Sequence, residues 1–107
     1  MRPPRRININ GVVYKVVEIP YIDPKTVDNG KDDDIICGAW DFWQSTIEIR
    51  NDLPIARKRI NLIHEVLHGI TEGMGIDEEQ IDEIAWGIYD TFKRNRSLLR
   101  YLWRIIF

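Results

Sequence analysis

The sequence has 107 residues, of which 44% are hydrophobic and 30% are charged, and its formal net charge is −2. Such a composition is typical of soluble globular chains and excludes a disordered or fibrous one, and the length suits one domain spanning residues 1–107. A charge this close to zero offers no general attraction to nucleic acid, so we expect no nucleic-acid partner.

The chain carries no sequence signal for export or for a membrane. Its basic N-terminus is not followed by an apolar segment, and no run of 18 apolar residues occurs. The single cysteine, Cys37, cannot form an internal disulfide, which fits a reducing compartment, and we interpret it as a small apolar residue rather than a metal ligand. We therefore expect a cytoplasmic protein without membrane contact.

The first predicted element is a β-hairpin over residues 6–19. Apolar residues alternate on both sides of Asn10-Gly11, a pair that tolerates positive φ and is the strongest short signal for a hairpin turn. Residues 20–34 are rich in proline, glycine and aspartate and read as an irregular connection. Asp32, Asp33 and Asp34 lack the spacing of a calcium loop, so we interpret them as a solvated run of charge.

Two further strands are predicted at residues 35–43 and 46–50, separated by Gln44-Ser45. The second strand alternates isoleucine with charged or polar residues, as half-buried strands do. Trp40, Phe42 and Trp43 are expected to pack in the core or on a sheet face; a substrate-facing role for one of them is the alternative, which nothing in the sequence supports.

Two helices follow. The first is predicted to start at Asn51 or Asp52, with Pro54 in its first turn, and to run to about Glu72 before a glycine turn. The second runs from about 78 to 95, with Asp77 as its N-cap. Its apolar stripe consists of Ile81, Ile84, Ala85, Ile88 and Phe92. Because the connection is short, we expect the two helices to pack together.

The first helix contains both histidines of the chain, at His64 and His68, with Glu65 directly after the first. Residues four apart share a helix face, so both imidazoles can bind one ion, which is the H-E-x-x-H pattern of zinc peptidases. Glu65 lies about 100° further round the helix, where a carboxylate can take a proton from a water in the open fourth position of the zinc. A chance polar stripe is the competing interpretation. It is disfavoured because the motif is surrounded by apolar residues: Ile60, Leu62, Ile63, Val66, Leu67 and Ile70.

With no third histidine, the third ligand must be sought among carboxylates of the second helix. At about 100° per residue, Glu78 lies roughly 60° from the centre of the apolar stripe, whereas Glu79 lies roughly 160° away and Glu83 also points outward. Geometry favours Glu78, and Glu79 remains the rival because predicted helix starts shift by a few residues. Asp82 falls on the flank of the same face, where it could accept the second ring N–H of a liganding histidine. Acidic residues also favour helix N-termini, which explains Glu79 better than Asp82.

Residues 35–93 resemble the ImmA/IrrE-type metallopeptidases, in particular compact members from phages and prophages. The resemblance rests on the strand at 45–49, the H-E-x-x-H helix, and a following helix in which Glu78, Ile81, Asp82 and Ala85 have the family's spacing. It implies that Glu78 is the third zinc ligand and that Asp82 accepts a hydrogen bond from a liganding histidine. A glutamate followed four residues later by an aspartate is also similar to thermolysin-like gluzincins. Ile81 stands where alanine is usual, and the spacing from His68 to Glu78 is short.

The C-terminal segment 97–107 is apolar except for Arg100 and Arg104. A helix that is apolar nearly all round must be covered, and we expect this one to pack on the domain's own sheet. A second copy of the chain or another protein could cover it instead. A membrane is a weaker option because the polar face is thin.

The sequence thus predicts an α+β fold: a small N-terminal antiparallel sheet, made of a hairpin plus two strands, packed on the H-E-x-x-H helix, a second ligand-bearing helix and a C-terminal helix. The expected function is a Zn2+-dependent endopeptidase acting on a protein or peptide substrate, which by the resemblance is a phage repressor or other regulator in a bacterial host cell. The oxyanion-stabilising residue is open among Tyr14, Tyr21, Tyr89 and Tyr101. The alternative is a non-enzymatic, phage-encoded interaction protein with a structural or vestigial metal site.

Overall fold

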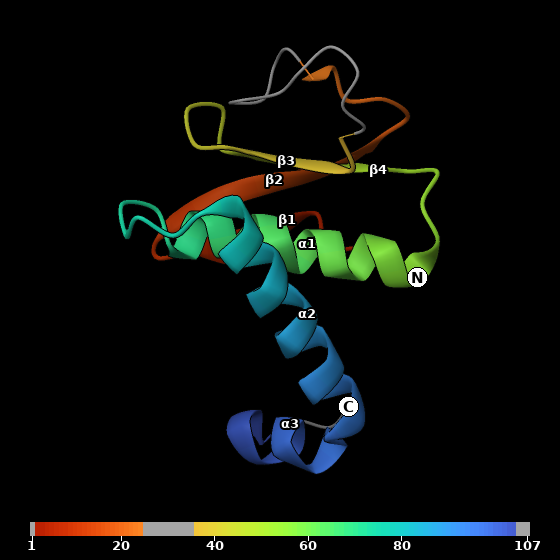
Figure 1. The fold of residues 1–107 in the computed structure, drawn as a ribbon, viewed down its shortest axis with the longest axis vertical. Coiled ribbons are helices and arrows are strands. Elements are labelled where there is room, and N and C mark those ends of the chain that lie inside the picture. Colours follow the sequence, from red (N-terminus) through yellow and green to blue (C-terminus); the bar gives the residue numbers. More distant parts are fainter. Residues whose placement is uncertain (1, 25–35, 105–107) are drawn as a thin grey trace.

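A four-stranded sheet and three helices form the α+β fold that the sequence predicts (Figure 1). The computed structural model describes residues 2–24 and 36–104. The strands are β1 (Arg6–Ile9), β2 (Val12–Ile19), β3 (Gly38–Asp41) and β4 (Thr46–Arg50), and the helices are α1 (Ile55–Ile70), α2 (Glu78–Arg94) and α3 (Arg96–Trp103). The acidic run 32–34 lies outside the described residues.

The N-terminal hairpin is confirmed. Asn10 and Gly11 both have positive φ, at 51° and 90°, and the register pairs Ile9 with Val12 across the two-residue turn. The Gly11 N–H donates to the Asn8 side chain over 2.8 Å, which further fixes the turn. Positive φ at both central residues matches the right-handed twist of the strands, so the Asn-Gly pair sets the register of β1 on β2.

The sheet is mixed rather than wholly antiparallel. Its strand order is β1-β2-β4-β3, and β2 pairs with β4 in parallel, while the two outer pairs are antiparallel. The prediction of an antiparallel sheet is therefore wrong for the central pair. The alternation of apolar and polar residues shows which face of a strand is buried. It is the same in parallel and antiparallel pairs, so it does not predict the direction of pairing. The strand order leaves β1 and β3 as the edges.

Strand β3 is shorter than the predicted strand at 35–43, because residues 42–45 form a turn instead. The Ser45 N–H donates to the Phe42 carbonyl over 3.2 Å, and Ser45 itself has a φ of 48°. Trp40 packs against the core, as expected. Trp43 is 91% exposed, so the prediction that it packs in the core or on a sheet face is wrong.

One face of the sheet forms the main core beneath α1. The buried residues are Ile9, Tyr14, Val16, Ile47 and Ile49, and Leu62 and Val66 of α1 pack against them. These strand residues alternate along β2 and β4, as a half-buried sheet requires. The helix face that covers the sheet is therefore fixed by Leu62 and Val66, one turn apart.

Helix α1 begins and ends slightly inside its predicted limits. Pro54 occupies the N-cap position without a side-chain hydrogen bond, so neither Asn51 nor Asp52 caps the helix. Asp52 instead pairs with Arg50 over 2.6 Å. At the other end, the helix stops two residues before Glu72, where Thr71 is the C-cap and both its N–H and its hydroxyl donate to the Leu67 carbonyl, over 2.9 and 2.7 Å.

Helix α2 starts where predicted and packs on α1. The Gln80 N–H donates to Asp77 and the Asp77 N–H donates to the Gln80 side chain, over 2.9 and 3.0 Å, which is a complete capping box. A second core joins the helices through Ile60, Leu67, Ile81 and Ala85. In the predicted apolar stripe of α2, only Ile84 is exposed, at 41%.

Helix α3 contradicts the expectation that the C-terminal segment packs on the sheet. Among the described elements it contacts only α2, where Trp103 meets Phe92 at a ring separation of 6.3 Å, and none of its residues is buried. Figure 1 shows it at the far end of α2, away from the strands. The sheet face that forms the core is already covered by α1. The chain turns at Asn95, and α3 then lies away from the sheet. Within residues 2–24 and 36–104, no helix is long and apolar enough to cross a membrane.

Candidate metal centre

The two histidines converge as their spacing predicts. One helical turn places the His64 and His68 rings 4.9 Å apart, with their Nε2 atoms separated by 3.2 Å. Their side chains are 12% and 25% exposed, so the pair lies in a partly enclosed site rather than on an open surface. Two nitrogen lone pairs that face each other this closely are suited to a shared proton or a cation.

Glu78 completes the group from the neighbouring helix. As the first residue of α2 it is brought back to α1 by the connecting turn, in which Gly73 and Gly75 have φ values of 80° and 71°. Its Oε1 lies 2.6 Å from His64 Nε2, and its Oε2 lies 2.9 Å from His68 Nε2. Glu79 and Glu83 are exposed and lie outside this cluster. Between the two carboxylates that the sequence left open, the structure brings Glu78 to the histidines.

The three side chains fit a metal ion in both donor type and spacing. His64, His68 and Glu78 each offer a ligand atom, and these atoms lie within 4.8 Å of one another. Bonds of about 2.0–2.1 Å in a tetrahedral zinc site place ligand atoms roughly 3.3 Å apart. The separation of 3.2 Å between the two Nε2 atoms, and of 3.2 Å from His68 Nε2 to Glu78 Oε1, agrees with this value, whereas His64 Nε2 and Glu78 Oε1 lie closer, at the 2.6 Å of a direct hydrogen bond. The cluster is therefore positioned to hold a metal ion.

Asp82 lies behind His64. Its Oδ1 is 3.4 Å from His64 Nδ1, the ring nitrogen that points away from the cluster. A carboxylate in that place favours the tautomer that carries its proton on Nδ1, and this tautomer leaves Nε2 free as a ligand. The helical spacing of Glu78 and Asp82 puts both carboxylates on the side of α2 that faces His64.

Glu65 is the one buried carboxyl among the described residues, at 6% exposure. Burial raises its pKa to about 7, against the opposing effect of the neighbouring histidines. It lies against Gly38 of β3: a Cβ at that position would be 2.8 Å from Glu65 Oε2. Gly38 thus leaves the space in which the carboxyl sits, a requirement that the sequence analysis did not detect.

The charges of the cluster stabilise one another. Burial alone would lower the pKa of His64, but the hydrogen bond with Glu78 and the charges of Glu65 and Asp82 outweigh it and raise this pKa. The hydrogen bonds from His64 and His68 hold the pKa of Glu78 well below its usual range. Glu78 therefore stays ionised at neutral pH, as a metal ligand must.

Trp40 is a neighbour of the cluster, for which the sequence favoured a packing role. Its ring is nearly parallel to that of His68, at 15° and a centroid separation of 6.3 Å. Gly69 permits this approach, since a Cβ there would lie 3.2 Å from Trp40 Nε1 and 2.9 Å from Ile9 Cδ1. The signal available in the sequence was the glycine directly after the second histidine, inside an otherwise good helix.

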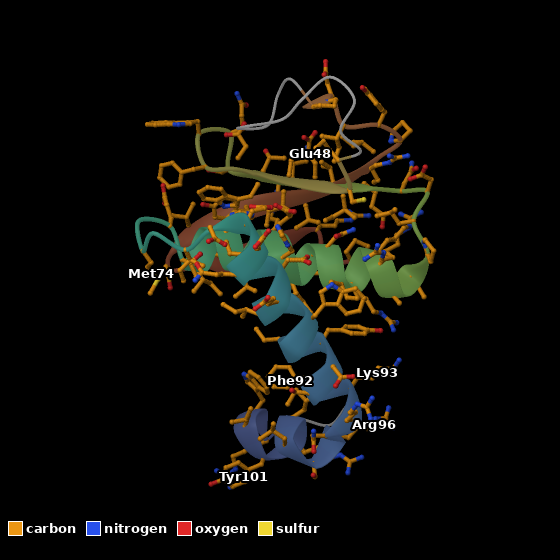
Figure 2. The ribbon with its side chains drawn as sticks, in the orientation of Figure 1. Glu48, Met74, Phe92, Lys93, Arg96 and Tyr101 are labelled. Atoms are coloured by element: carbon orange, nitrogen blue, oxygen red, sulfur yellow. The ribbon has the colours of Figure 1, made fainter. Side chains whose placement is uncertain are left out.

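The predicted phenols are distributed widely. Tyr14 is buried in the sheet core beside Trp40, and Tyr101 lies on α3 at the far end of the molecule (Figure 2).

Comparisons of the chain with models of protein families, with curated proteins and with solved structures gave no match. The functional argument therefore rests on the geometry of the cluster and on the motif.

Proposed function

We propose that the chain is a zinc-dependent endopeptidase in which His64, His68 and Glu78 hold the metal and Glu65 is the general base. The observation that carries the proposal is the convergence of three ligand atoms from α1 and α2. The buried carboxyl of Glu65, whose pKa is raised, lies on α1 with the two histidines. Two imidazoles, one carboxylate and an open fourth position form a common ligand set of catalytic zinc. The same nitrogen and oxygen donors favour zinc over magnesium or calcium.

A zinc ion held there would polarise the scissile carbonyl and lower the pKa of the attacking water. Glu65 would accept the proton of that water as it attacks and would then return the proton to the nitrogen of the departing amine. Burial raises the pKa of Glu65 to about 7 in the metal-free chain, and a bound cation would favour the ionised carboxylate, which is the form that accepts the proton of the water. Asp82 keeps His64 in the tautomer that binds metal, and Gly38 leaves room for the Glu65 carboxyl.

The resemblance to ImmA/IrrE-type metallopeptidases supports a protein substrate, such as a phage repressor or another regulator, in the cytoplasm of a bacterial host. The resemblance also supports Glu78 over Glu79 as the third ligand. Substrate class and location are therefore part of the proposal.

The competing function is a non-enzymatic interaction protein whose metal is structural or whose motif is vestigial. A structural zinc has four protein ligands and needs no base beside it. The buried Glu65 favours the enzyme, because burial of a carboxyl lowers stability at neutral pH, whereas a catalytic metal centre needs a base.

The first experiment is the zinc content of the purified protein, measured for wild type, Glu78→Ala and Glu79→Ala. The last variant is a matched control, since it removes the adjacent exposed carboxylate. The proposal requires zinc in wild type and Glu79→Ala and its loss or weakening in Glu78→Ala. Equal loss in both variants, or no zinc in wild type after metal is supplied, would contradict it.

The second experiment separates the enzyme from the interaction protein. Glu65→Gln keeps the size of the side chain but cannot accept a proton. We expect it to keep zinc and to lose cleavage of a peptide library that the zinc-loaded wild type cleaves. Cleavage that persists in Glu65→Gln would show that the mechanism is wrong.

A further inference from the structure

A series of aromatic rings leads from the candidate metal centre to the surface. Beyond His68 come Trp40, Phe42 and Trp43, which we call the aromatic ladder. The ring separation is 6.3 Å from His68 to Trp40, 6.3 Å from Trp40 to Phe42, and 5.6 Å from Phe42 to Trp43. Exposure increases outward: Trp40 is half-buried, Phe42 is 37% exposed and Trp43 is 91% exposed.

Folding does not account for the outer part of the ladder. Phe42 and Trp43 lie in the β3–β4 turn, where small polar residues would serve the backbone better. A tryptophan that stays 91% exposed gains almost none of the stabilisation that burial of its ring would give. Exposed apolar groups gathered beside a polar site are a feature of ligand-binding surfaces.

The backbone of the turn is fixed by two hydrogen bonds. The Gln44 N–H donates to the Asp41 carboxylate over 3.0 Å, and the Ser45 N–H donates to the Phe42 carbonyl over 3.2 Å. Both contacts fix the positions from which the outer rings project. Rigid aromatic side chains bind at a low cost in conformational entropy.

Successive rings of the ladder contact one another. Phe42 lies 6.3 Å from Trp40 at an interplanar angle of 46° and 5.6 Å from Trp43 at 78°, so the rings form one continuous apolar surface. Beside them, Oδ1 of the Asp41 carboxylate accepts the Gln44 N–H. The surface therefore offers apolar ring faces to a ligand.

We propose that the aromatic ladder is a subsite for an apolar, preferentially aromatic, side chain of a peptide held at the metal centre. This inference rests on the proposed function and adds a substrate class: peptides with a large apolar residue near the cleaved bond. Trp40 connects the two sites, because its ring stacks on His68 at 15° and also lies 6.3 Å from Phe42, at an interplanar angle of 46°. A ligand anchored at the metal can then place its side chain against Phe42.

The test compares two metal-directed probes by calorimetry on the zinc-loaded protein, acetohydroxamate and 3-phenylpropanohydroxamate. Both carry the same metal-binding group, and only the second has a phenyl ring to place on the ladder. We expect the phenyl compound to bind wild type about tenfold more tightly or better, as one good aromatic contact provides. The double variant Phe42→Ala/Trp43→Ala should reduce this preference to about threefold or less while the affinity for acetohydroxamate is unchanged.

Tyr101→Ala is the matched control, because Tyr101 is an 82% exposed aromatic residue on α3, far from the ladder (Figure 2). It should alter neither affinity. If the double variant does not fold, Trp43→Ala alone replaces it, read with 5-phenylpentanohydroxamate, whose longer chain reaches further along the ladder.

The outcomes separate the two proposals. Equal binding of both probes by wild type, or a preference that survives the variants, overturns the subsite while the metal centre stands. Absence of zinc from the wild-type protein, measured before any probe is added, overturns the proposed function and the subsite with it.

Discussion

The buried carboxyl of Glu65 lowers the stability of the fold when it ionises, but it suits proton transfer. A carboxyl that is 6% exposed is easier to keep neutral than ionised, and burial raises its pKa from 4.5 to about 7. The raised pKa suits proton transfer at neutral pH. The same shift reduces the stability of the folded chain when the carboxyl ionises.

The pH dependence of stability follows from this shift. Between pH 4.5 and about 7 the metal-free folded chain holds a proton on Glu65 that the unfolded chain has released. The stabilisation is fully present below the lower value and is lost as the pH rises through the upper one. We expect Glu65→Gln to be more stable than wild type above pH 7, by up to roughly 3 kcal/mol, and about equal below pH 4.5.

This prediction is checked by urea denaturation of both chains in the presence of a chelator, across pH 4 to 8. A constant difference in the free energy of unfolding across that range would show that the Glu65 carboxyl does not titrate near neutrality. The chelator is needed because a bound cation would stabilise the ionised form.

Gly38 supports the same carboxyl from the sheet. A methyl group there would lie 2.8 Å from Glu65 Oε2, so Gly38→Ala must displace the side chain or the strand. We expect a loss of about 1–3 kcal/mol in the free energy of unfolding, as in other overpacked sites, with the zinc content retained. Zinc lost together with stability would instead assign Gly38 to the fold of the metal centre as a whole.

Gly69 and Gly87 both lie inside helices, but replacing each by alanine is expected to change the free energy of unfolding in opposite directions. Gly69 lies in α1 against Ile9 and Trp40, whereas a Cβ at Gly87 in α2 would meet nothing within 4 Å. Gly87→Ala should raise the free energy of unfolding by about 0.5–1 kcal/mol through helix propensity alone. Gly69→Ala should lower it, because the new methyl group displaces Trp40 from His68.

Chemical denaturation of the two variants measures both effects, and zinc affinity provides a second readout. Only Gly69→Ala should weaken zinc binding, since only that glycine borders a ring stacked on a histidine. A gain in stability from Gly69→Ala would mean that Ile9 and Trp40 yield without cost.

Helix α3 is expected to contribute little to the stability of the rest of the fold. None of its residues is buried, whereas Ile81 of α2 is enclosed between the helices. Tyr101→Ala should therefore change the free energy of unfolding by less than about 0.5 kcal/mol, while Ile81→Ala should cost about 2–5 kcal/mol. A large loss from Tyr101→Ala would indicate that α3 is covered in solution, for example by a second copy, which sedimentation would then detect.

For the whole molecule, the metal is expected to couple the two helices. His64 and His68 belong to α1 and Glu78 to α2, so an ion that binds all three stabilises only the folded arrangement. At a hundredfold excess of free zinc over its dissociation constant, the gain is about 2.7 kcal/mol.

Thermal melting with and without a chelator tests this coupling. The chelator should lower the melting temperature of wild type and of Glu79→Ala but leave that of Glu78→Ala unchanged. An equal shift in Glu78→Ala would place the stabilising ion elsewhere, and no shift in any chain would argue against a bound metal.

Local patterns in the sequence were enough to predict the elements and most of the cluster. The Asn10-Gly11 turn, the capping box at Asp77 and the one-turn spacing of His64 and His68 are each set by residues within four positions, where backbone geometry leaves few alternatives. The rotation of α2 by about 100° per residue was enough to favour Glu78.

Only the tertiary structure decided the features that depend on residues far apart in the chain. The parallel pairing of β2 with β4, the space that Gly38 leaves for Glu65, and the stacking of Trp40 on His68 each join segments of different elements. The same is true of α3, whose apolar sequence predicted burial although α1 already covers the inner sheet face. Periodicity shows which side of an element is apolar and must be buried. Which neighbouring element buries it depends on contacts between segments far apart in the chain.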